Sequence, residues 1–422
     1  MIIPRWVTCE LLNHLETHRV VSVVGCRRSG KTTMLLNAPL KNIRMKSLDV
    51  AVSFSSAVED PSWFVRRSAS EILVIDEVQK VPELIGEVKF QVDRNPEKGQ
   101  YIIAGSTDYR RLPHANESLA GRAGMVRLRT LTEAEQRGMP PGFLQALFDG
   151  LLPLSVKFEC SKQIVLDAVI RGGYPETVSI RTAAARSRWF KSYVQNQVLP
   201  DMKAHWDTRK IPIFEKVMEC AANISGRELN KAKIASKFGI AWVTLDKYWS
   251  AMEAMGLVDI VRGWTKKDLD RAGSSPKGFM TDTGLMAHSL NIRSASTFLE
   301  DTEKFQNEGP MLVKTWVYNQ LISEADMNPT WKLNYFRSRS HEIDFLITNE
   351  RGRTVGIEVK AGESVNSGDF KHLVWFQERV GKDNFTGIVL YAGKEVQAGG
   401  NGLFAIPMSA LWSDFSKWEK LS

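Results

Sequence analysis

The chain has 422 residues, which is too long for one ordinary domain and predicts two to four. Its hydrophobic content of 43% and charged content of 25% are those of a globular protein, and no apolar run approaches the roughly 18 residues of a membrane-spanning helix. The net charge of +8 weakly favours a polyanionic partner, and the four scattered cysteines, without a CxxC pair, argue against a zinc site or a disulfide framework.

The first residues do not have the layout of a signal peptide. Arg5, Glu10 and Glu16 interrupt any apolar region at this end of the chain. We therefore expect a cytoplasmic protein without a membrane partner.

A glycine-rich stretch, GCRRSGKT at residues 25–32, matches the phosphate-binding pattern GxxxxGK[ST]. The apolar run 20–24 predicts a buried strand before it, and residues 33–37 predict the first turns of a helix after it. A strand that leads through such a turn into a helix presents backbone N–H groups and the positive end of the helix dipole to an anion. The pattern predicts a nucleotide site; the alternative is a glycine-rich turn that binds nothing.

Each part of this loop has an expected role. Gly25 and Gly30 permit the turn and a close approach of the backbone to phosphate. Lys31 is expected to reach the β- and γ-phosphates, and the Thr32 hydroxyl to ligate magnesium, so the expected cofactors are ATP and Mg²⁺. The other residues predicted to bind the nucleotide are Cys26, Arg27, Arg28, Ser29 and Thr33.

Two carboxylates follow the apolar run at residues 72–75, which predicts a strand buried on both faces. Ligands of open α/β sheets bind at the carboxyl ends of the strands, where Asp76 and Glu77 are expected to lie. Asp76 is suited to hold magnesium through water, and Glu77 to polarise the attacking water. The alternative is an ordinary acidic turn.

A third strand is predicted at residues 101–105 and ends in Ser106 and Thr107. These side chains are expected between the two preceding strands, where they would orient water or sense the γ-phosphate.

Arg122 follows in the segment ESLAGR and is a candidate arginine finger, which stabilises charge in the transition state. Such a residue acts across subunits only if the protein is an oligomer. Arg127 and Arg129 are competing candidates.

Several motifs together resemble one family. In chain order they are GCRRSGKTT, ILVIDEVQ, YIIAGS, SLAGRA, GGYPE at residues 172–176 and PKGFMTDTGL at residues 276–285. Their order and spacing are similar to those of prokaryotic AAA+ superfamily ATPases of the AAA_14/DUF4143 type. The resemblance implies a P-loop ATPase core, a winged-helix segment and a C-terminal domain similar to PD-(D/E)XK nucleases.

The resulting fold class is α/β, with a P-loop AAA+ parallel-sheet core, a helical and winged-helix middle, and an α/β restriction-endonuclease-like domain at the C-terminal side. The expected domains are the ATPase core at 1–145, a helical lid or linker at 146–212, the winged helix at 213–300 and the nuclease-like domain at 301–422.

Residues 213–261 independently predict a helix-turn-helix. Helices are expected at 213–222, 229–238 and 242–255, with a turn at Gly239 and a wing strand at 257–261. In a DNA-binding version, the helix from Trp242 would enter the major groove and expose Thr244, Asp246 and Lys247. Winged helices also serve as packing or partner modules, so both interpretations stay open.

Two basic segments are candidate nucleic-acid contacts. Residues 181–216 hold eight Lys or Arg against three Asp or Glu, with aromatic residues that include Trp189 and Trp206 between them. The predicted wing, residues 262–277, has five basic and two acidic residues. The alternative is an ordinary solvated basic face.

The C-terminal region contains the pattern D-x13-E-x-K, formed by Asp344, Glu358 and Lys360 in a predicted β-hairpin. Glu358 and Lys360 are two residues apart and share a strand face. Two carboxylates suit a divalent ion, and a lysine suits the generation of hydroxide for phosphodiester attack.

Nucleases of the resembled fold usually add a glutamate from the preceding helix. Here, alignment on Trp316 and Val317 places Lys314 at that position, and Glu308 lies nearly two turns earlier. A cation there repels a metal unless another carboxylate substitutes. The competing interpretation is a retained fold that only binds nucleic acid or a partner.

We therefore expect an AAA+ ATPase whose ATP hydrolysis drives or gates action on a nucleic acid, DNA rather than RNA. A homo-oligomer with a trans arginine finger, and a possible protein partner, belong to this hypothesis. One alternative is an ATP-licensed, Mg²⁺-dependent DNA nuclease in defence or repair. The other is a regulatory, protein-binding switch timed by nucleotide and without nuclease activity.

Overall fold

The computed structural model describes residues 2–108, 110, 119–206, 211–264 and 275–420. The chain divides into two compact units. Unit 1 comprises residues 1–130, 194–209 and 250–257, and unit 2 comprises residues 131–193, 210–249 and 258–422. Some sequence expectations lie outside the described residues, namely those on Glu117, Ser118, the Trp206 side chain and most of the predicted wing.

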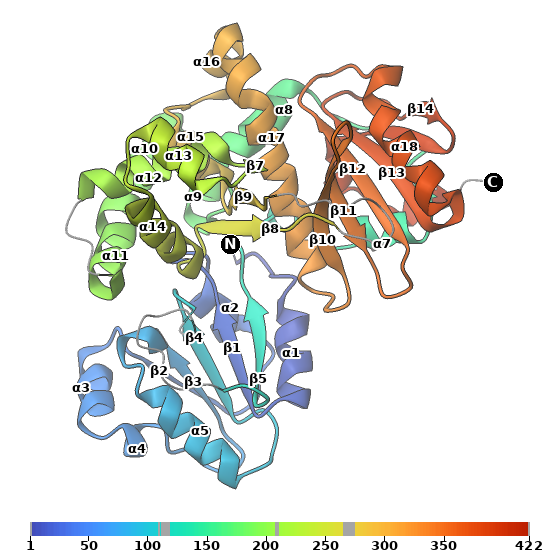
Figure 1. Cartoon of the computed structure of the whole chain (residues 1–422). Coiled ribbons are helices and arrows are strands. Elements are labelled where there is room, and N and C mark those ends of the chain that lie inside the picture. Colours follow the sequence, from blue (N-terminus) through green and yellow to red (C-terminus); the bar gives the residue numbers. More distant parts are fainter. Residues whose placement is uncertain (1, 109, 111–118, 207–210, 265–274, 421–422) are drawn as a thin grey trace. The chain divides into compact units, whose positions relative to one another are not determined.

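Unit 1 is built on one parallel sheet with the strand order β2-β3-β4-β1-β5 (Figure 1). All four neighbouring pairs are parallel. The strands are β1 (Val20–Val24), β2 (Ile43–Ser47), β3 (Ile72–Asp76), β4 (Tyr101–Gly105) and β5 (Ala123–Arg127). The three strands predicted from apolar runs are therefore confirmed, and β4 lies between β1 and β3 as expected.

Helices cover both faces of this sheet because successive strand side chains point to opposite faces. Tyr101 and Ile103 of β4 pack in one buried cluster, which includes side chains of α3, α4 and α5. Ile102 and Ala104 pack in the other, which includes side chains of α1 and α2. The helices of unit 1 are α1 (Thr8–Thr17), α2 (Lys31–Asn37), α3 (Ala51–Glu59), α4 (Pro61–Phe64), α5 (Leu84–Arg94) and α11 (Leu199–Trp206).

Unit 2 begins with a helical segment and a small sheet. Its antiparallel strands have the order β7-β9-β8, and β8 pairs with β9 from Val258↔Met280 to Val261↔Lys277. The elements of this part are α6 (Glu133–Gln136), α7 (Phe143–Phe148), β6 (Leu151–Leu152), α8 (Lys162–Arg171), α9 (Pro175–Ser179), α10 (Ala183–Tyr193), α12 (Ile211–Ile224), β7 (Arg227–Glu228), α13 (Lys231–Phe238), α14 (Trp242–Ala254), β8 (Val258–Val261) and β9 (Lys277–Met280). The division between the units passes through α14.

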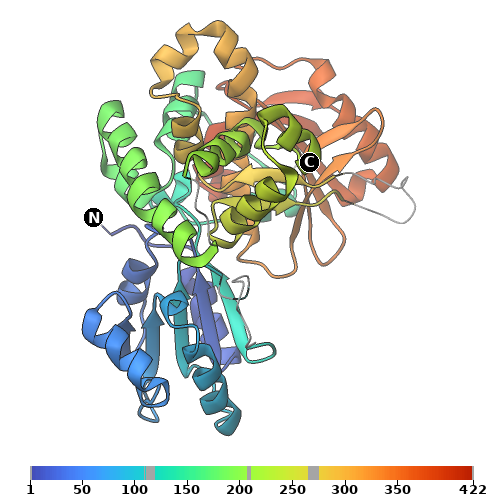
Figure 2. The same ribbon diagram turned by 60° about the vertical axis from the view of Figure 1, so that its left-hand side comes forward.

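A six-stranded mixed sheet forms the rest of unit 2, in orange to red in Figures 1 and 2, with the order β10-β11-β12-β13-β15-β14. The hairpin predicted around Asp344 and Glu358 is formed by β11 and β12, which pair antiparallel. The elements of this part of unit 2 are α15 (Thr283–Ser289), α16 (Ala295–Glu300), α17 (Thr302–Ala325), β10 (Lys332–Arg337), β11 (Glu342–Thr348), β12 (Thr354–Lys360), α18 (Lys371–Val380), β13 (Phe385–Tyr391), β14 (Gln397–Gly400), β15 (Leu403–Pro407) and β16 (Glu419–Lys420), which pairs with β6.

Helix α18 connects β12 to β13, which are parallel neighbours. Its Leu373 and Phe376 are completely buried and pack in one cluster with Phe385 and Val389 of β13. A parallel sheet and a mixed sheet, each packed with helices, confirm the α/β class. The division into four domains stays a prediction.

Candidate nucleotide site and carboxylate cluster

The phosphate loop lies between the carboxyl end of β1 and the start of α2. Gly30 precedes the helix with φ 96°, a left-handed conformation that favours glycine. A Cβ on Gly25 would stand 2.3 Å from the Leu128 carbonyl oxygen, so this position has no room for a side chain. The Lys31 ammonium is buried and donates to the carbonyl oxygens of Gly25 at 2.9 Å and Cys26 at 3.3 Å. Within the described part of the chain, the loop therefore curls around a lysine whose bonds there are to neutral carbonyl oxygens.

Asp76, at the end of β3, joins the strand edge to this loop. Its Oδ2 accepts a hydrogen bond from the Thr32 hydroxyl at 2.7 Å, and its Oδ1 accepts one from the Glu77 amide at 3.0 Å. Asp76 is buried. The structure thus brings together the hydroxyl and the carboxylate that the sequence predicts for magnesium.

Glu77 has φ 60° and ψ 39°, a left-handed conformation that is uncommon for a residue with a side chain and costs about 1 kcal/mol or more. Gln79 Nε2 donates to Glu77 Oε2 at 2.5 Å and to Ser106 Oγ at 2.9 Å. Gln79 therefore links the predicted catalytic base on β3 to the predicted sensor on β4. Sequence reasoning quoted Gln79 within a motif but assigned it no role.

Arg27 adds a cation to the same carboxylate. Its Nη1 lies 3.4 Å from Glu77 Oε2, and its Nε lies 2.5 Å from Asp201 Oδ2 on α11. Burial lowers the pKa of the Arg27 guanidinium, but the hydrogen bond to Asp201 and the charge of Glu77 outweigh it, and the pKa is raised overall. Asp201 is 174 residues away in the chain and no local pattern marks it.

The residues around the loop fit a nucleotide. Within the described part of the chain, Ser29 Oγ and Thr107 Oγ1 are buried without a hydrogen-bond partner, although each can both donate and accept. Arg28 has φ 64°, and Thr33 is exposed on the first turn of α2. The orphaned hydroxyls belong to the two segments in which the sequence predicts phosphate contacts.

Arg122 is not among these residues. It immediately precedes β5, and its carbonyl oxygen accepts from the Val20 amide at 3.2 Å, at the amino end of β1. The parallel register runs from Val20↔Ala123 to Val24↔Arg127, so Arg122 lies a strand length, roughly 16 Å at 3.3 Å per residue, from the loop that follows Val24. Arg127 is the residue beside Val24.

The Arg122 guanidinium pairs with Asp93 on α5, with Nη2 3.0 Å from Oδ2. This hydrogen bond raises the pKa of Arg122. A role for Arg122 in the phosphate site of its own chain is excluded by this position, and a role in a neighbouring chain stays a prediction.

Unit 2 contains a second group of charges, which we call the carboxylate cluster: Lys314, Asp344 and Glu358. Asp344 on β11 accepts a hydrogen bond from the Val359 amide at 3.0 Å. Its other oxygen lies 2.5 Å from the ammonium of Lys314, which projects from α17. The lysine that sequence alignment placed at the glutamate position therefore binds one of the two predicted metal ligands directly.

Burial would raise the pKa of the Asp344 carboxyl, but the charges of Lys314 and, after it, Lys277 outweigh burial and hold this pKa below its usual value. For Glu358, burial and the negative charge of Asp344 together raise the pKa well above its ordinary value. Burial lowers the pKa of Lys314, and the charge of Asp344 more than compensates, so that pKa is raised. The cluster is a buried ion pair with a second carboxylate beside it.

The other two predicted members have partners or neighbours of their own. Lys360 pairs with Asp369 at 2.8 Å. Glu308 precedes Lys314 by six residues on α17, about 9 Å along the axis, and the charges that act on it are those of Lys304 and Asp301. Among the described residues, no three His, Cys, Asp or Glu side chains are placed to hold a metal ion together.

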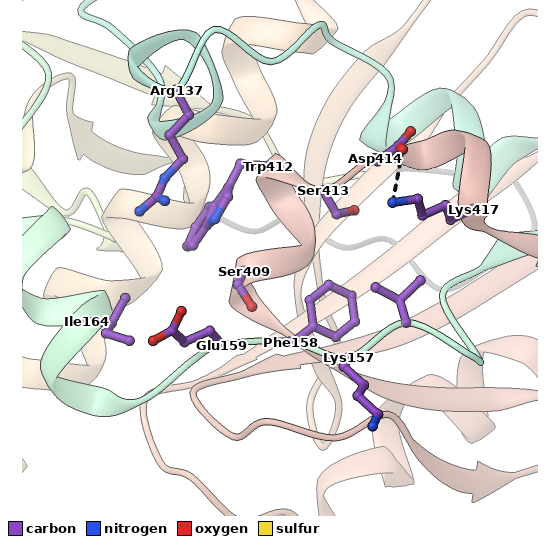
Figure 3. Close-up of a pocket in the computed structure, with 11 residues that line it drawn as sticks. Arg137, Lys157, Phe158, Glu159, Ile164, Ser409, Trp412, Ser413, Asp414 and Lys417 are labelled. Atoms are coloured by element: carbon purple, nitrogen blue, oxygen red, sulfur yellow. Dashed lines mark ion pairs between the residues drawn. The ribbon is translucent and has the colours of Figure 1, made fainter.

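A cavity of about 460 Å³ in unit 2 was not anticipated (Figure 3). Arg137, Trp412 and Lys417 line part of it. The Arg137 guanidinium lies 4.9 Å from the Trp412 ring centre and pairs with Glu133, while Lys417 lies 3.5 Å from Asp414. Arg137 and Lys417 thus have acidic partners, and we assign no ligand to the cavity.

Comparison with known proteins divides the chain into three matched regions. Residues 17–136 match the family model described as "AAA domain". Residues 162–296 and 311–411 match two models described as domains of unknown function, DUF8612 and DUF4143. Uncharacterized proteins of Mycobacterium tuberculosis and Mycobacterium bovis are each 24% identical over 364 residues, which cover 85% of this chain and 74% of theirs.

Two solved structures show more distant similarity. The Walker-type ATPase of Pyrococcus abyssi is 12% identical, with 69% of this chain and 99% of that chain covered and a TM-score of 0.38. The RuvB Holliday junction branch migration motor of Thermotoga maritima is 20% identical, with 61% and 88% covered and a TM-score of 0.28. Scores this low carry no argument about the fold, which rests on the strand order.

No helix among the described residues is long and apolar enough to cross a membrane. The AAA match covers the strands that hold the phosphate loop, Asp76 and Ser106, and the DUF4143 match covers the carboxylate cluster. The matches support an AAA-type ATPase domain followed, at the C-terminal side, by a DUF4143 domain.

Proposed function

We propose that unit 1 binds Mg²⁺-ATP and hydrolyses it. The hydrogen bond between Thr32 and Asp76 is the observation that carries this proposal, because it places a hydroxyl and a carboxylate together beside a loop that curls around Lys31. Lys31 would turn from neutral carbonyls to phosphate oxygens, and Thr32 and Asp76 would hold the metal. The bound metal would neutralise charge that develops on the phosphates.

Glu77 is the proposed catalytic base, because a carboxylate at this edge can orient water and accept its proton. Gln79 donates to both Oε2 of Glu77 and the Ser106 hydroxyl, so a movement of Ser106 at the end of β4 would also move the proposed base. We assign Gln79 a positioning role, which the left-handed turn at Glu77 supports by placing both side chains on the same edge.

The decisive test replaces Glu77 by Gln. This variant keeps the side-chain shape but cannot accept a proton, so ATP turnover should fall about 10²–10⁴-fold while ATP binding persists. Lys31→Ala is the contrast, since it should lose binding itself. Turnover by Glu77→Gln at the wild-type rate would exclude this assignment.

We further propose that unit 2 binds nucleic acid, DNA rather than RNA, through a winged helix formed by α12, β7, α13, α14, β8 and β9. Support comes from a surface that we call the helix-pair face: Lys233 and Lys237 of α13 with Trp242 and Val243 at the start of α14. All four are exposed, and Trp242 and Val243 keep 52% and 69% of their surface accessible. Exposed cations and an exposed aromatic ring on two consecutive helices suit phosphates and stacked bases.

Lys233→Ala and Lys237→Ala should each weaken DNA binding and each reduce the slope of log affinity against log salt by about one. Trp242→Ala should weaken binding at every salt concentration. The matched control is Lys382→Ala, which removes an exposed lysine from another part of unit 2. Equal salt slopes for all lysine variants would contradict DNA binding through this face and favour the protein-binding switch.

DNA cleavage by Asp344, Glu358 and Lys360 is the remaining hypothesis, and two contacts argue against it. Lys314 holds Asp344, and Lys360 is paired with Asp369. A retained fold that binds without cutting agrees better with these pairs. The nucleotide site and the helix-pair face together favour an ATP-driven switch or motor, with a homo-oligomer as the assembly in which Arg122 acts on a neighbouring chain.

A further inference from the structure

We infer that the Lys314 ammonium is a resident cation that takes the place of a divalent metal in the carboxylate cluster. The wild-type chain would then bind no metal there. Removal of this one side chain would open a site for a hard divalent cation such as Mn²⁺. This inference is independent of ATP hydrolysis and would survive the failure of that proposal.

The geometry of the cluster supports the replacement. Asp344 and Glu358 come from adjacent strands of one hairpin, and Lys314 reaches them from α17. The ammonium bonds Asp344 at 2.5 Å, a distance at which an oxygen would ligate Ca²⁺ or a slightly smaller ion. The ammonium, with one positive charge, thus contacts Asp344 at the position where a divalent metal ion would bring two.

Glu358 gives an independent indication that the ammonium does not satisfy every oxygen of the cluster. Its side chain is 8% exposed, and within the described residues its Oε1 is buried without a hydrogen-bond partner. A buried polar atom without a partner is rare in native proteins. A monovalent ammonium meets Asp344 and leaves this oxygen unsatisfied, whereas a divalent ion suits both carboxylates.

The surroundings keep the lysine in place. Gly226 approaches the Lys314 stem closely, since a Cβ at that glycine would stand 3.3 Å from the Lys314 Cδ. Thr315, next to Lys314, is bonded to Ser225 at 2.8 Å, which anchors α17 to the segment that contains Gly226. A buried lysine nearby, Lys277, also lowers the pKa of Asp344 through its charge, but its ammonium pairs directly with Glu342 at 2.5 Å.

The test measures Mn²⁺ binding by calorimetry and the melting temperature with and without Mn²⁺, on the full chain without nucleotide. Lys314→Ala vacates the position, so it should melt at a lower temperature than the wild type and recover much of the loss in Mn²⁺. Its affinity for Mn²⁺ should exceed that of the wild type by at least about tenfold. In the wild type and in Lys314→Arg, substitution of Glu358 should not change the Mn²⁺ affinity or the effect of Mn²⁺ on the melting temperature.

Two variants separate a cluster site from adventitious binding. Lys314→Met removes the charge but fills the space, so Mn²⁺ should not restore its stability. Lys314→Ala combined with Glu358→Gln should lose the gain in affinity. If Lys314→Ala gains nothing over Lys314→Met, or if the wild type binds Mn²⁺ and Glu358→Gln abolishes that binding, the inference is wrong.

If Lys314→Ala does not fold, Mn²⁺ binding by the wild type still tests the inference. A titration of the wild type against Glu358→Gln shows whether the cluster holds Mn²⁺ with the lysine present. Equal, weak binding by both proteins supports a resident ammonium. Tighter binding by the wild type overturns it.

Discussion

Each unit contains a lysine near two carboxylates at the edge of a sheet, and the two lysines are used differently. Lys31 donates to the carbonyl oxygens of Gly25 and Cys26, so Asp76 is left to accept the Thr32 hydroxyl. Lys314 donates to a carboxylate instead. The first arrangement leaves Asp76 available for a metal, and the second neutralises Asp344.

This difference shows that a lysine and two carboxylates in a sequence do not define a metal site. Whether the carboxylates can bind a metal depends on which atom accepts the hydrogen bond from the lysine. A buried ammonium on a carbonyl can be redirected to phosphate at small cost, whereas one on a buried carboxylate is held by charge and by the absence of water.

The largest expected effect is on stability. Lys314→Ala leaves Asp344 and Glu358 buried without their cation, and removal of one partner of such a pair costs about 3–5 kcal/mol. Lys31→Ala breaks bonds to neutral carbonyls only and should cost about 1 kcal/mol. Urea unfolding of both variants measures the difference. Equal losses would show that the two lysines are not distinguished in this way.

Another buried carboxylate, Glu324, accepts hydrogen bonds from the backbone and sharpens the contrast. It accepts from the Leu144 amide at 2.9 Å, and burial raises its pKa to about 7. Because the folded value is above the unfolded one, its contribution is complete below the unfolded pKa and is lost as pH rises through about 7.

Glu324→Gln keeps an acceptor for Leu144 but does not titrate. From pH 4.5 to pH 8 the wild type should lose up to about 3 kcal/mol of stability relative to this variant. Urea unfolding across that range measures the gap, and a gap that does not change with pH would contradict a neutral Glu324.

How much of this was predictable depends on the distance between partners in the chain. The apolar runs and the loop at Gly25–Thr32 are local patterns, and they predicted β1, β3 and β4 because a buried parallel strand needs apolar residues on both faces. The partnership of Arg27 with Asp201 had no such signal, since it depends on how α11 packs. Lys314 was predictable in part. The sequence marked it as unusual at its position, but only the structure showed that it pairs with Asp344.

A smaller effect is expected on ATP turnover, which should depend on Asp76 of the nucleotide site. Asp76→Asn removes a charge from the proposed metal site, so ATP turnover should fall about 10²-fold, or nearly 3 kcal/mol in the barrier, with a higher Mg²⁺ requirement. Asp383→Asn, an exposed aspartate in unit 2, is the matched control and should retain wild-type turnover. A rate for Asp76→Asn within threefold of the control would argue against a metal ligand at this position.

The smallest expected effect concerns Arg27, which contacts both the proposed base Glu77 and Asp201. Arg27 lies between Glu77 and Asp201, at 3.4 Å and 2.5 Å. Without the Asp201 carboxylate, the guanidinium has Glu77 as its nearest acidic partner and holds it more firmly, so Asp201→Asn should lower kcat about fivefold with little change in KM. Arg27→Gln removes the cation that causes this loss, and addition of Asp201→Asn to it should have no further effect on kcat. The cycle of four proteins gives a coupling energy of about 1 kcal/mol if Arg27 carries the effect. If the two substitutions are additive, α11 does not act on the base through Arg27.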